Sequence, residues 1–264
     1  MKTVIKYELV NYLRTRRFYI LLGITVALSG LLTAVVGHYR PQSFLSSPLA
    51  FYSNWWGMGA TYILILSGIF FGGDAISGEF QNKTGYFIVV NPIKRSTIYA
   101  GKWFASFIAS LAIFVTFALF TIANGMYYFW LEVPYQFGLS MVFSVLYLMA
   151  ILGVTFLLSS VFKSSSVSIL VTAILFIFAF SLIQTLVSNL AGMEPWFMLT
   201  YGAEIIGNVL KDPYPSHIVE IPIGPNLRFT VYNATIFEGV IIMGAYFVVC
   251  AILGLLIFER RDFA

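Results

Sequence analysis

The side chains that could do chemistry in this chain are few, and several of them lie in one short stretch. Only 10% of the 264 residues are charged, against roughly 25% in an ordinary soluble domain. Residues 72–102 nevertheless carry a group of charged side chains, namely Asp74, Glu79, Lys83, Lys94, Arg95 and Lys102. Clustered charges of both signs suit the docking of a soluble partner through ion pairs and hydrogen bonds. We expect this segment to receive energy from outside the chain.

The residue types that catalysis or metal binding needs do not occur at the required spacings. The two histidines, His38 and His217, are far apart in the sequence, and neither HExxH nor Cys-x-x-Cys occurs. A phosphate-binding GxxxxGK[ST] loop is also missing, because Trp103 follows Gly101 and Lys102. We therefore expect no catalytic residue, no metal site and no bound cofactor in this chain, which is not an enzyme by itself.

The composition indicates a membrane protein. Hydrophobic residues make up 59% of the chain, and the mean hydropathy is +0.88. A bilayer core of about 30 Å needs roughly 20 apolar residues per helical span. Six such stretches occur, near residues 18–39, 50–72, 103–127, 138–161, 166–190 and 234–258. A soluble helical core would need polar faces on these helices, which have almost none. We predict an all-α membrane protein whose residues 1–264 form a single transmembrane domain.

The distribution of Lys and Arg predicts the orientation of the spans. If the N-terminus is cytoplasmic, the inner segments hold Lys2, Lys6, Arg14, Arg16, Arg17, Lys83, Lys94, Arg95, Lys102, Lys163, Arg260 and Arg261. The outer segments then hold only Arg40, Lys211 and Arg228. Both ends are therefore predicted to be cytoplasmic, in a multi-pass plasma-membrane protein. The positive flank suits anionic lipid headgroups, and its scatter over short turns gives no support for nucleic-acid binding.

Residues 1–17 have the pattern of a helix that lies in the inner membrane interface. Ile5, Leu9, Tyr12 and Leu13 recur at helical spacing, with Lys and Arg around much of the remainder. Such a helix would place its apolar side in lipid and its cations among the headgroups. The alternative is a positive flank that only assists insertion of the first span.

The segment after the second span predicts a short helix. Asp74 could cap it by accepting hydrogen bonds from free backbone N–H groups, and Ile76 and Phe80 would share one side. Glu79 and Lys83 stand at i and i+4, in the order that favours an ion pair.

A second helix is predicted to lead into the third span. Asn91 and Pro92 match an N-cap followed by proline at the first helical position. This helix would run through Ile93 and onward past Gly101. Arg95 and Lys102, seven residues apart, would then project from nearly the same side.

The longest outer connection is predicted over residues 191–233. Its first part, Trp196 to Lys211, could form an amphipathic helix on the outer leaflet. Prolines exclude a continuous helix from the second part, at Pro213, Pro215, Pro222 and Pro225. Residues 228–232 alternate like a strand, but a lone strand is not stable. The whole segment is either a lid over the outer end of a pathway or an inert connector.

Ionisable groups deep in a span would indicate ion-coupled transport. The best candidate, Glu238, lies close to the outer start of the last span, and Glu204 is expected to be solvated in the outer connection. Gln184 and Asn124 also fall near outer span ends. An ion-gradient carrier is therefore weakly supported.

The chain resembles the permease subunits of type-2 ABC transporters, the ABC-2 type permease family. The resemblance is to a loose spacing that begins with a Glu near the inner end of span two, here Glu79, Thr84, Pro92, Arg95, Gly101 and Lys102. It extends to the layout of an interfacial helix, six spans and a larger outer segment before span six. Lys83 departs from the family, which often has Gly before the Thr.

The resemblance implies a type-2 ABC exporter fold with a cytoplasmic coupling helix between spans two and three, at roughly residues 74–91. Such subunits pair with a second copy or a related permease, and a separate ABC ATPase subunit binds the ATP and Mg²⁺. The residues implied in coupling to that ATPase are Asp74, Glu79, Phe80, Lys83, Thr84, Pro92, Arg95 and Lys102. The alternative is that Glu79, Arg95 and Lys102 form only surface ion pairs and lipid contacts.

Three hypotheses for the function remain open. The leading hypothesis is the permease subunit of an ATP-driven exporter, which forms the substrate pathway as a dimer. The second is an ATPase-driven helper that delivers or extracts a lipid or protein component. The third is an ion-gradient carrier, which would work without any ATPase. The substrate class, whether peptide, drug, lipid or ion, does not follow from the residues.

Overall fold

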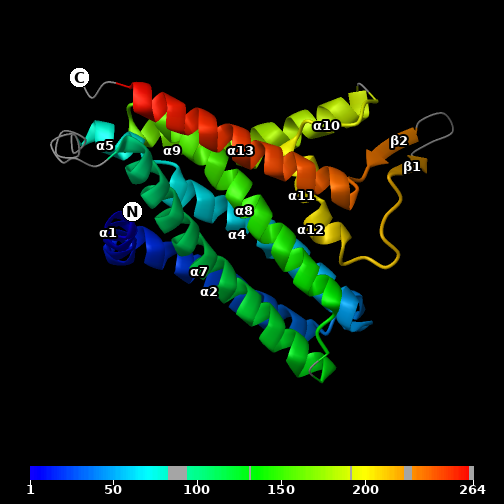
Figure 1. Cartoon of the computed structure of the whole chain (residues 1–264). Coiled ribbons are helices and arrows are strands. Elements are labelled where there is room, and N and C mark those ends of the chain that lie inside the picture. The colour runs from blue at the N-terminus through cyan, green and yellow to red at the C-terminus, as the bar shows by residue number, and fades with distance from the viewer. Residues whose placement is uncertain (83–93, 131, 191, 223–227, 262–264) are drawn as a thin grey trace.

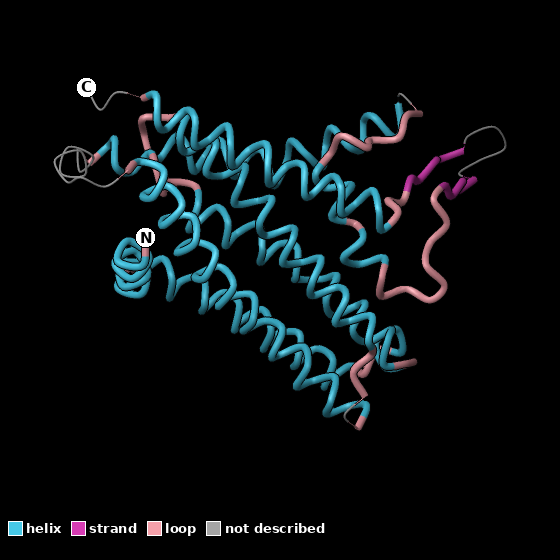
Figure 2. Tube along the Cα trace, viewed as in Figure 1, coloured by secondary structure: helices cyan, strands magenta, loops and turns pink. Residues whose placement is uncertain are grey.

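The computed structural model describes residues 1–82, 94–130, 132–190, 192–222 and 228–261 (Figures 1 and 2). Within these residues, six helical segments are long and apolar enough to cross a membrane: Arg16–Tyr39, Pro48–Gln81, Arg95–Phe129, Tyr135–Val161, Ser165–Asn189 and Ile236–Arg260. Each overlaps one predicted span, so the helical membrane class is confirmed. Hydropathy predicts the spans because the backbone of a segment that crosses lipid must form its hydrogen bonds within its own helix, whatever the neighbouring helices are.

The described elements follow one another as a helical bundle with one small hairpin. The N-terminal half contains α1 (Lys2–Arg14), α2 (Arg16–Tyr39), α3 (Gln42–Leu45), α4 (Pro48–Gly72), α5 (Ser77–Gln81) and α7 (Arg95–Phe129). The C-terminal half contains α8 (Tyr135–Val161), α9 (Ser165–Ile174), the π-helix η1 (Leu175–Ala179), α10 (Phe180–Leu190), α11 (Leu199–Ala203), α12 (Ile205–Asn208), β1 (Ile218–Pro222), β2 (Arg228–Tyr232) and α13 (Ile236–Arg260).

The bundle has two distinct ends (Figure 1). The N-terminus, α5 and the C-terminal end of α13 lie together at one end, which we call the terminal end. The β1–β2 hairpin and α12 lie toward the other, which we call the hairpin end. The N-terminus and the C-terminal end of α13 therefore lie on one side of the spans, as the positive-inside pattern predicts for an even number of crossings.

α4 is the most enclosed span, and α13 is the least. Of the 18 most apolar consecutive residues in each span, 72% are buried in the span that contains α4, and 11% are buried in α13. α4 packs against α7 and α8, while α13 packs along α8 and against α11. Small residues allow the α11–α13 approach, because a Cβ on Gly239 would lie 2.8 Å from the carbonyl oxygen of Gly202. The spans around α4 therefore present broad apolar faces outward.

The outer connection differs from the expected single amphipathic helix. Residues 199–208 form two short helices, α11 and α12, whose side chains are mostly buried against the spans. The strand over residues 228–232 is also not alone, because β1 pairs with it antiparallel, with Ile218 opposite Tyr232. Pro213 and Pro215 lie outside helices and Pro222 ends β1, as the prediction of no continuous helix requires, while β1 itself is not predicted by the sequence.

α7 begins later than the sequence predicts. Lys94 has an extended backbone and serves as the N-cap, so α7 starts at Arg95. The carbonyl of Lys94 accepts from the N–H groups of Thr97 and Ile98, at 2.9 and 3.3 Å. The predicted start at Asn91 and Pro92 lies outside the described residues.

Candidate functional site at the terminal end

A buried ion cluster joins three helices at the terminal end. Lys102 Nζ on α7 lies 2.6 Å from Glu8 Oε1 on α1 and 2.7 Å from Glu79 Oε1 on α5. The Lys102 side chain is only 6% exposed, so this amine is almost wholly removed from water. Burying one cation between two carboxylates is tolerable only because all three are paired. The cluster thus fixes the position of α5 relative to α1 and α7.

Tyr12 makes a second connection between α1 and the spans. Its hydroxyl donates to the carbonyl oxygen of Phe71, at the end of α4, and lies 2.9 Å from Ser106 Oγ on α7. Burial raises the pKa of Tyr12 well above its usual range. The expectation that Tyr12 faces lipid is therefore wrong, because its hydroxyl needs a partner and finds two inside the bundle. Whether α1 lies in the membrane interface stays a prediction.

The N-terminus of α5 is capped from another span. Ser159 Oγ on α8 accepts from the N–H groups of Ile76 and Ser77, both at 2.9 Å. The predicted cap, Asp74, forms an ion pair with Arg17 instead. A side chain from α8 can satisfy both free N–H groups because the turn at residues 73–76 lies directly against that helix. At the other end, Gln81 Oε1 accepts from Ser165 N at 2.7 Å, at the start of α9.

The C-terminal end of the chain completes the site. The guanidinium of Arg261 lies 4.3 Å from the centre of the Phe80 ring and donates to the carbonyls of Ser160 and Phe162 at the end of α8. Arg95 donates to the carbonyls of Glu259 and Arg261, at 3.0 and 2.6 Å. Arginines at helix C-termini satisfy carbonyls that have no partner in the helix. Phe80 is thereby held against α13 and α8.

Five of the predicted coupling residues are described, and they lie in one region: Asp74, Glu79, Phe80, Arg95 and Lys102. Lys83, Thr84 and Pro92 lie outside the described residues. Among the described contacts, Arg95 donates to carbonyls at the end of α13, and Lys102 pairs with carboxylates on α1 and α5.

Sequence reasoning missed several residues of this site, which are Glu8, Arg17, Ser159 and Arg261. Only Glu8 offered a signal. It is the one acidic residue among the cations of residues 1–17, four residues before Tyr12 on the same helical side.

A cavity lies among α4, α8, η1 and α11, nearer the hairpin end. Its volume is about 290 Å³, and its lining includes Ile65, Tyr147, Phe176, Thr200 and Glu204. The hydroxyls of Tyr147 and Thr200 are buried and have no hydrogen-bond partner among the described residues. π-helical turns such as η1 frequently occur at functional sites. The cavity therefore offers unused polar groups to an occupant.

Glu204 is not solvated as the sequence suggests. Its Oε1 accepts from Gln184 Nε2 at 2.6 Å, and burial raises the pKa of its carboxyl to about 7. The short helices α11 and α12 fold against the spans and carry Glu204 out of water.

A family model described as "ABC-2 family transporter protein" matches residues 2–263, nearly the whole chain. The chain belongs to the ABC-2 transporter family. A search among curated proteins finds no match.

This ABC-2 permease is a multi-pass membrane component of an ABC transporter, and the family lacks an ATPase domain of its own. Membership agrees with the absence of a phosphate-binding loop in the sequence. At the terminal end of this permease, the short helix α5 is attached to four spans, through contacts with α7, α8, α9 and the end of α13.

The stability of the ABC-2 permease should depend on pH through Glu204. Burial raises its pKa from 4.5 to about 7, so between these values the folded chain holds a proton that the unfolded chain has released. Stability is therefore expected to fall as pH rises from 4.5 through about 7, and to level off above that. Thermal unfolding of the purified protein across this range measures the slope.

Glu204→Gln should flatten this slope, and Glu259→Gln is the matched control, because Glu259 is exposed at the end of α13. A wild-type slope in Glu204→Gln would contradict the assignment to Glu204.

Proposed function

We propose that this chain is the permease subunit of an ATP-driven exporter, which forms the substrate pathway as a dimer. Separate ATPase subunits would bind at the terminal end, which faces the cytoplasm, and act on the segment that contains α5. The observation that carries this proposal is the attachment of α5 to the spans through Lys102 and Ser159. Because α5 is fixed to the spans in this way, a displacement of α5 by the ATPase would also displace the spans.

Displacement of α5 has four routes into the bundle. The Glu79–Lys102–Glu8 cluster leads to α7 and α1. Ser159 leads to α8, and Gln81 leads to the start of α9 through Ser165 N. Phe80 leads to α13 through Arg261. Because packed helices move as rigid elements, a shift of α5 would shift the ends of several spans together.

The cavity near the hairpin end is a candidate part of the substrate pathway. Its lining combines aromatic and aliphatic side chains with the carboxyl of Glu204 and the hydroxyls of Tyr147 and Thr200, which have no partner within the described part of the chain. Small-molecule sites commonly combine an apolar lining with a few polar groups. This lining suits an amphipathic solute that carries a hydrogen-bond donor.

The double variant Glu79→Gln/Phe80→Ala tests the coupling role. With the ATPase partner co-expressed, we expect the variant to insert normally but to retain less ATPase and to lose substrate-stimulated ATP hydrolysis. The reason is that it loses the ion pair to Lys102 and the ring beneath Arg261. The measurements are co-purification of the ATPase and its turnover in proteoliposomes.

Glu259→Gln serves as the control, since it removes an exposed carboxylate at the same end of the bundle. Unchanged ATPase recruitment and unchanged transport in the double variant would contradict coupling through α5.

A second candidate function, ion-gradient-driven transport, is favoured by one observation. Glu204 lines the cavity, and its pKa of about 7 allows it to gain and lose a proton near neutral pH. Proteoliposomes that contain only this chain separate the two functions. Transport driven by a pH gradient alone, and abolished by Glu204→Gln, would favour the second. Transport that requires the ATPase and ATP supports the first.

A further inference from the structure

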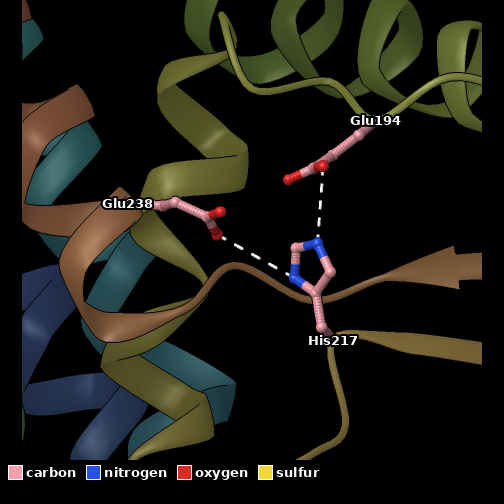
Figure 3. A group of neighbouring side chains, drawn as sticks. All are labelled: Glu194, His217 and Glu238. Atoms are coloured by element: carbon pink, nitrogen blue, oxygen red, sulfur yellow. Dashed lines mark ion pairs between the residues drawn. The ribbon is translucent and has the colours of Figure 1, made fainter.

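A cluster of metal-ligating side chain types lies at the hairpin end, which is opposite to α5 (Figure 1). Its members are Glu194, His217 and Glu238 (Figure 3). Glu194 follows α10, His217 immediately precedes β1, and Glu238 lies in the first turn of α13. One ligand atom from each residue lies within 4.8 Å of the others. His217 stands between the two carboxylates, with Nε2 3.4 Å from Glu194 Oε2 and Nδ1 3.9 Å from Glu238 Oε2.

Each of the three side chains is oriented by a further hydrogen bond. Glu194 Oε1 accepts from the hydroxyl of the fully buried Tyr201 at 2.6 Å. Glu238 Oε2 accepts from Thr235 N at 2.9 Å, as part of a capping box at the start of α13. Metal ligands are typically held in this way by outer partners, which fix the ligand atoms before the ion arrives.

The backbone next to His217 is fixed as well. Asn233 N donates to the carbonyl of His217 at 2.8 Å, and Asn233 Nδ2 donates to the carbonyl of Ser216 at 2.9 Å. His217 Nδ1 lies 3.0 Å from the carbonyl oxygen of Asn233, which can only accept. Nδ1 of a neutral ring therefore carries the hydrogen, and Nε2 presents its lone pair.

With the ring neutral, as metal binding requires, this arrangement leaves two acceptors facing each other. Nε2 of that form and Glu194 Oε2 are 3.4 Å apart, and neither has a hydrogen to donate. Among the described side chains, no Lys or Arg forms an ion pair with Glu194 or Glu238. Two carboxylates and a neutral imidazole carry two negative charges, which match one divalent cation.

We propose that Glu194, His217 and Glu238 form a binding site for a divalent transition-metal ion, with Zn²⁺ as the best match. Zinc accepts His nitrogen and carboxylate oxygen at about 2.0–2.2 Å, so tetrahedral ligand atoms lie about 3.4 Å apart. The Glu194–His217 pair already has this separation, at 3.4 Å. The three ligand atoms lie within 4.8 Å of one another, so they need to close to about 3.4 Å to bind one ion.

The site is accessible and has an open position. The side chains of Glu194, His217 and Glu238 are 28%, 36% and 36% exposed, so an ion can enter from solvent. Three protein ligands leave a fourth position for water. The bound ion would join the α10–α11 connection, the β1–β2 hairpin and α13. A two-stranded hairpin is marginally stable alone, so such a junction would order this end of the molecule.

Zinc binding to the purified, full-length chain in detergent tests this site. After treatment with a chelator, the protein is titrated with Zn²⁺ in competition with a chromophoric chelator. We expect one equivalent per chain, and His217→Ala should weaken this binding at least 100-fold. His38→Ala is the matched control, because His38 is the only other histidine and lies exposed at the end of α2. It should bind zinc as the wild type does.

Two further measurements separate loss of a ligand from loss of the fold. His217→Asn retains an amide donor near the place of Nδ1 but removes Nε2, and it should lose zinc binding with an unchanged size-exclusion profile. Zinc should also raise the melting temperature of the wild type and of His38→Ala, but not of His217→Asn. Unchanged zinc affinity in both His217 variants, or no binding by the wild type, would overturn the proposal. Because binding is measured on the isolated chain, its result is separate from that of any transport assay.

Discussion

Lys102→Met should destabilise the permease more than any other single substitution at the terminal end. The variant removes the buried cation that pairs with both Glu8 and Glu79. Removing one partner of a buried charge network typically costs about 3–5 kcal/mol. In a chain of this size, such a loss corresponds to a fall of roughly 10 °C in melting temperature. Thermal unfolding of the purified protein in detergent measures it.

Two further variants accompany Lys102→Met, one as a control and one to remove every charge of the cluster. Lys163→Met removes an exposed lysine from the turn between α8 and α9, and it should change the melting temperature little. The triple variant Glu8→Gln/Glu79→Gln/Lys102→Met removes every charge of the cluster and should recover much of the lost stability. Equal effects of Lys102→Met and Lys163→Met would mean that the cluster is not a buried unit.

Ser159→Ala is expected to release α5 from α8. The substitution leaves the N–H groups of Ile76 and Ser77 without the oxygen that accepts from both. Each buried, unsatisfied donor costs about 1–3 kcal/mol, so the turn should open locally at lower cost than the bundle unfolds. Hydrogen–deuterium exchange should therefore accelerate at residues 76–77. Coupling to the ATPase should weaken in parallel, because the route from α5 to α8 is lost.

Ser110→Ala is the matched control for this prediction. Ser110 is also a buried serine on a span, but its Oγ has no hydrogen-bond partner among the described residues. This substitution should leave exchange at residues 76–77 unchanged. If Ser159→Ala behaves as Ser110→Ala does, Ser159 does not hold α5.

The spans could be predicted because their signal is local. Twenty apolar residues in a row need a membrane whatever surrounds them, and Lys and Arg mark the inner side. Glu79 and Lys102 could be named through the family resemblance, which carries positions but not partners. The ion pair predicted between Glu79 and Lys83 lies outside the described residues, while the pairing of Glu79 with Lys102, 23 positions further along the chain, is described.

The remaining contacts depend on residues far apart in the sequence. Asp74 is a good N-cap by type, but Ser159 reaches the same N–H groups from another helix and leaves Asp74 to Arg17. Glu204 looked solvated because the residues around it do not reveal how α11 and α12 fold against the spans. Helix propensity and residue spacing describe one segment at a time. Which residue caps α5, and whether Glu204 is solvated, is decided only by tertiary packing.

Photo-crosslinking from position 82 tests the central claim most directly. Asn82 is exposed beside α5, and a photoreactive amino acid there should form a covalent link to a co-expressed ATP-binding subunit. The control position is Trp130, which is 92% exposed at the far end of α7. We predict a crosslink to the ATPase from position 82 and none from position 130. A crosslink from position 130 alone, or labelling of position 82 from outside intact cells, would contradict docking of the ATPase at the terminal end.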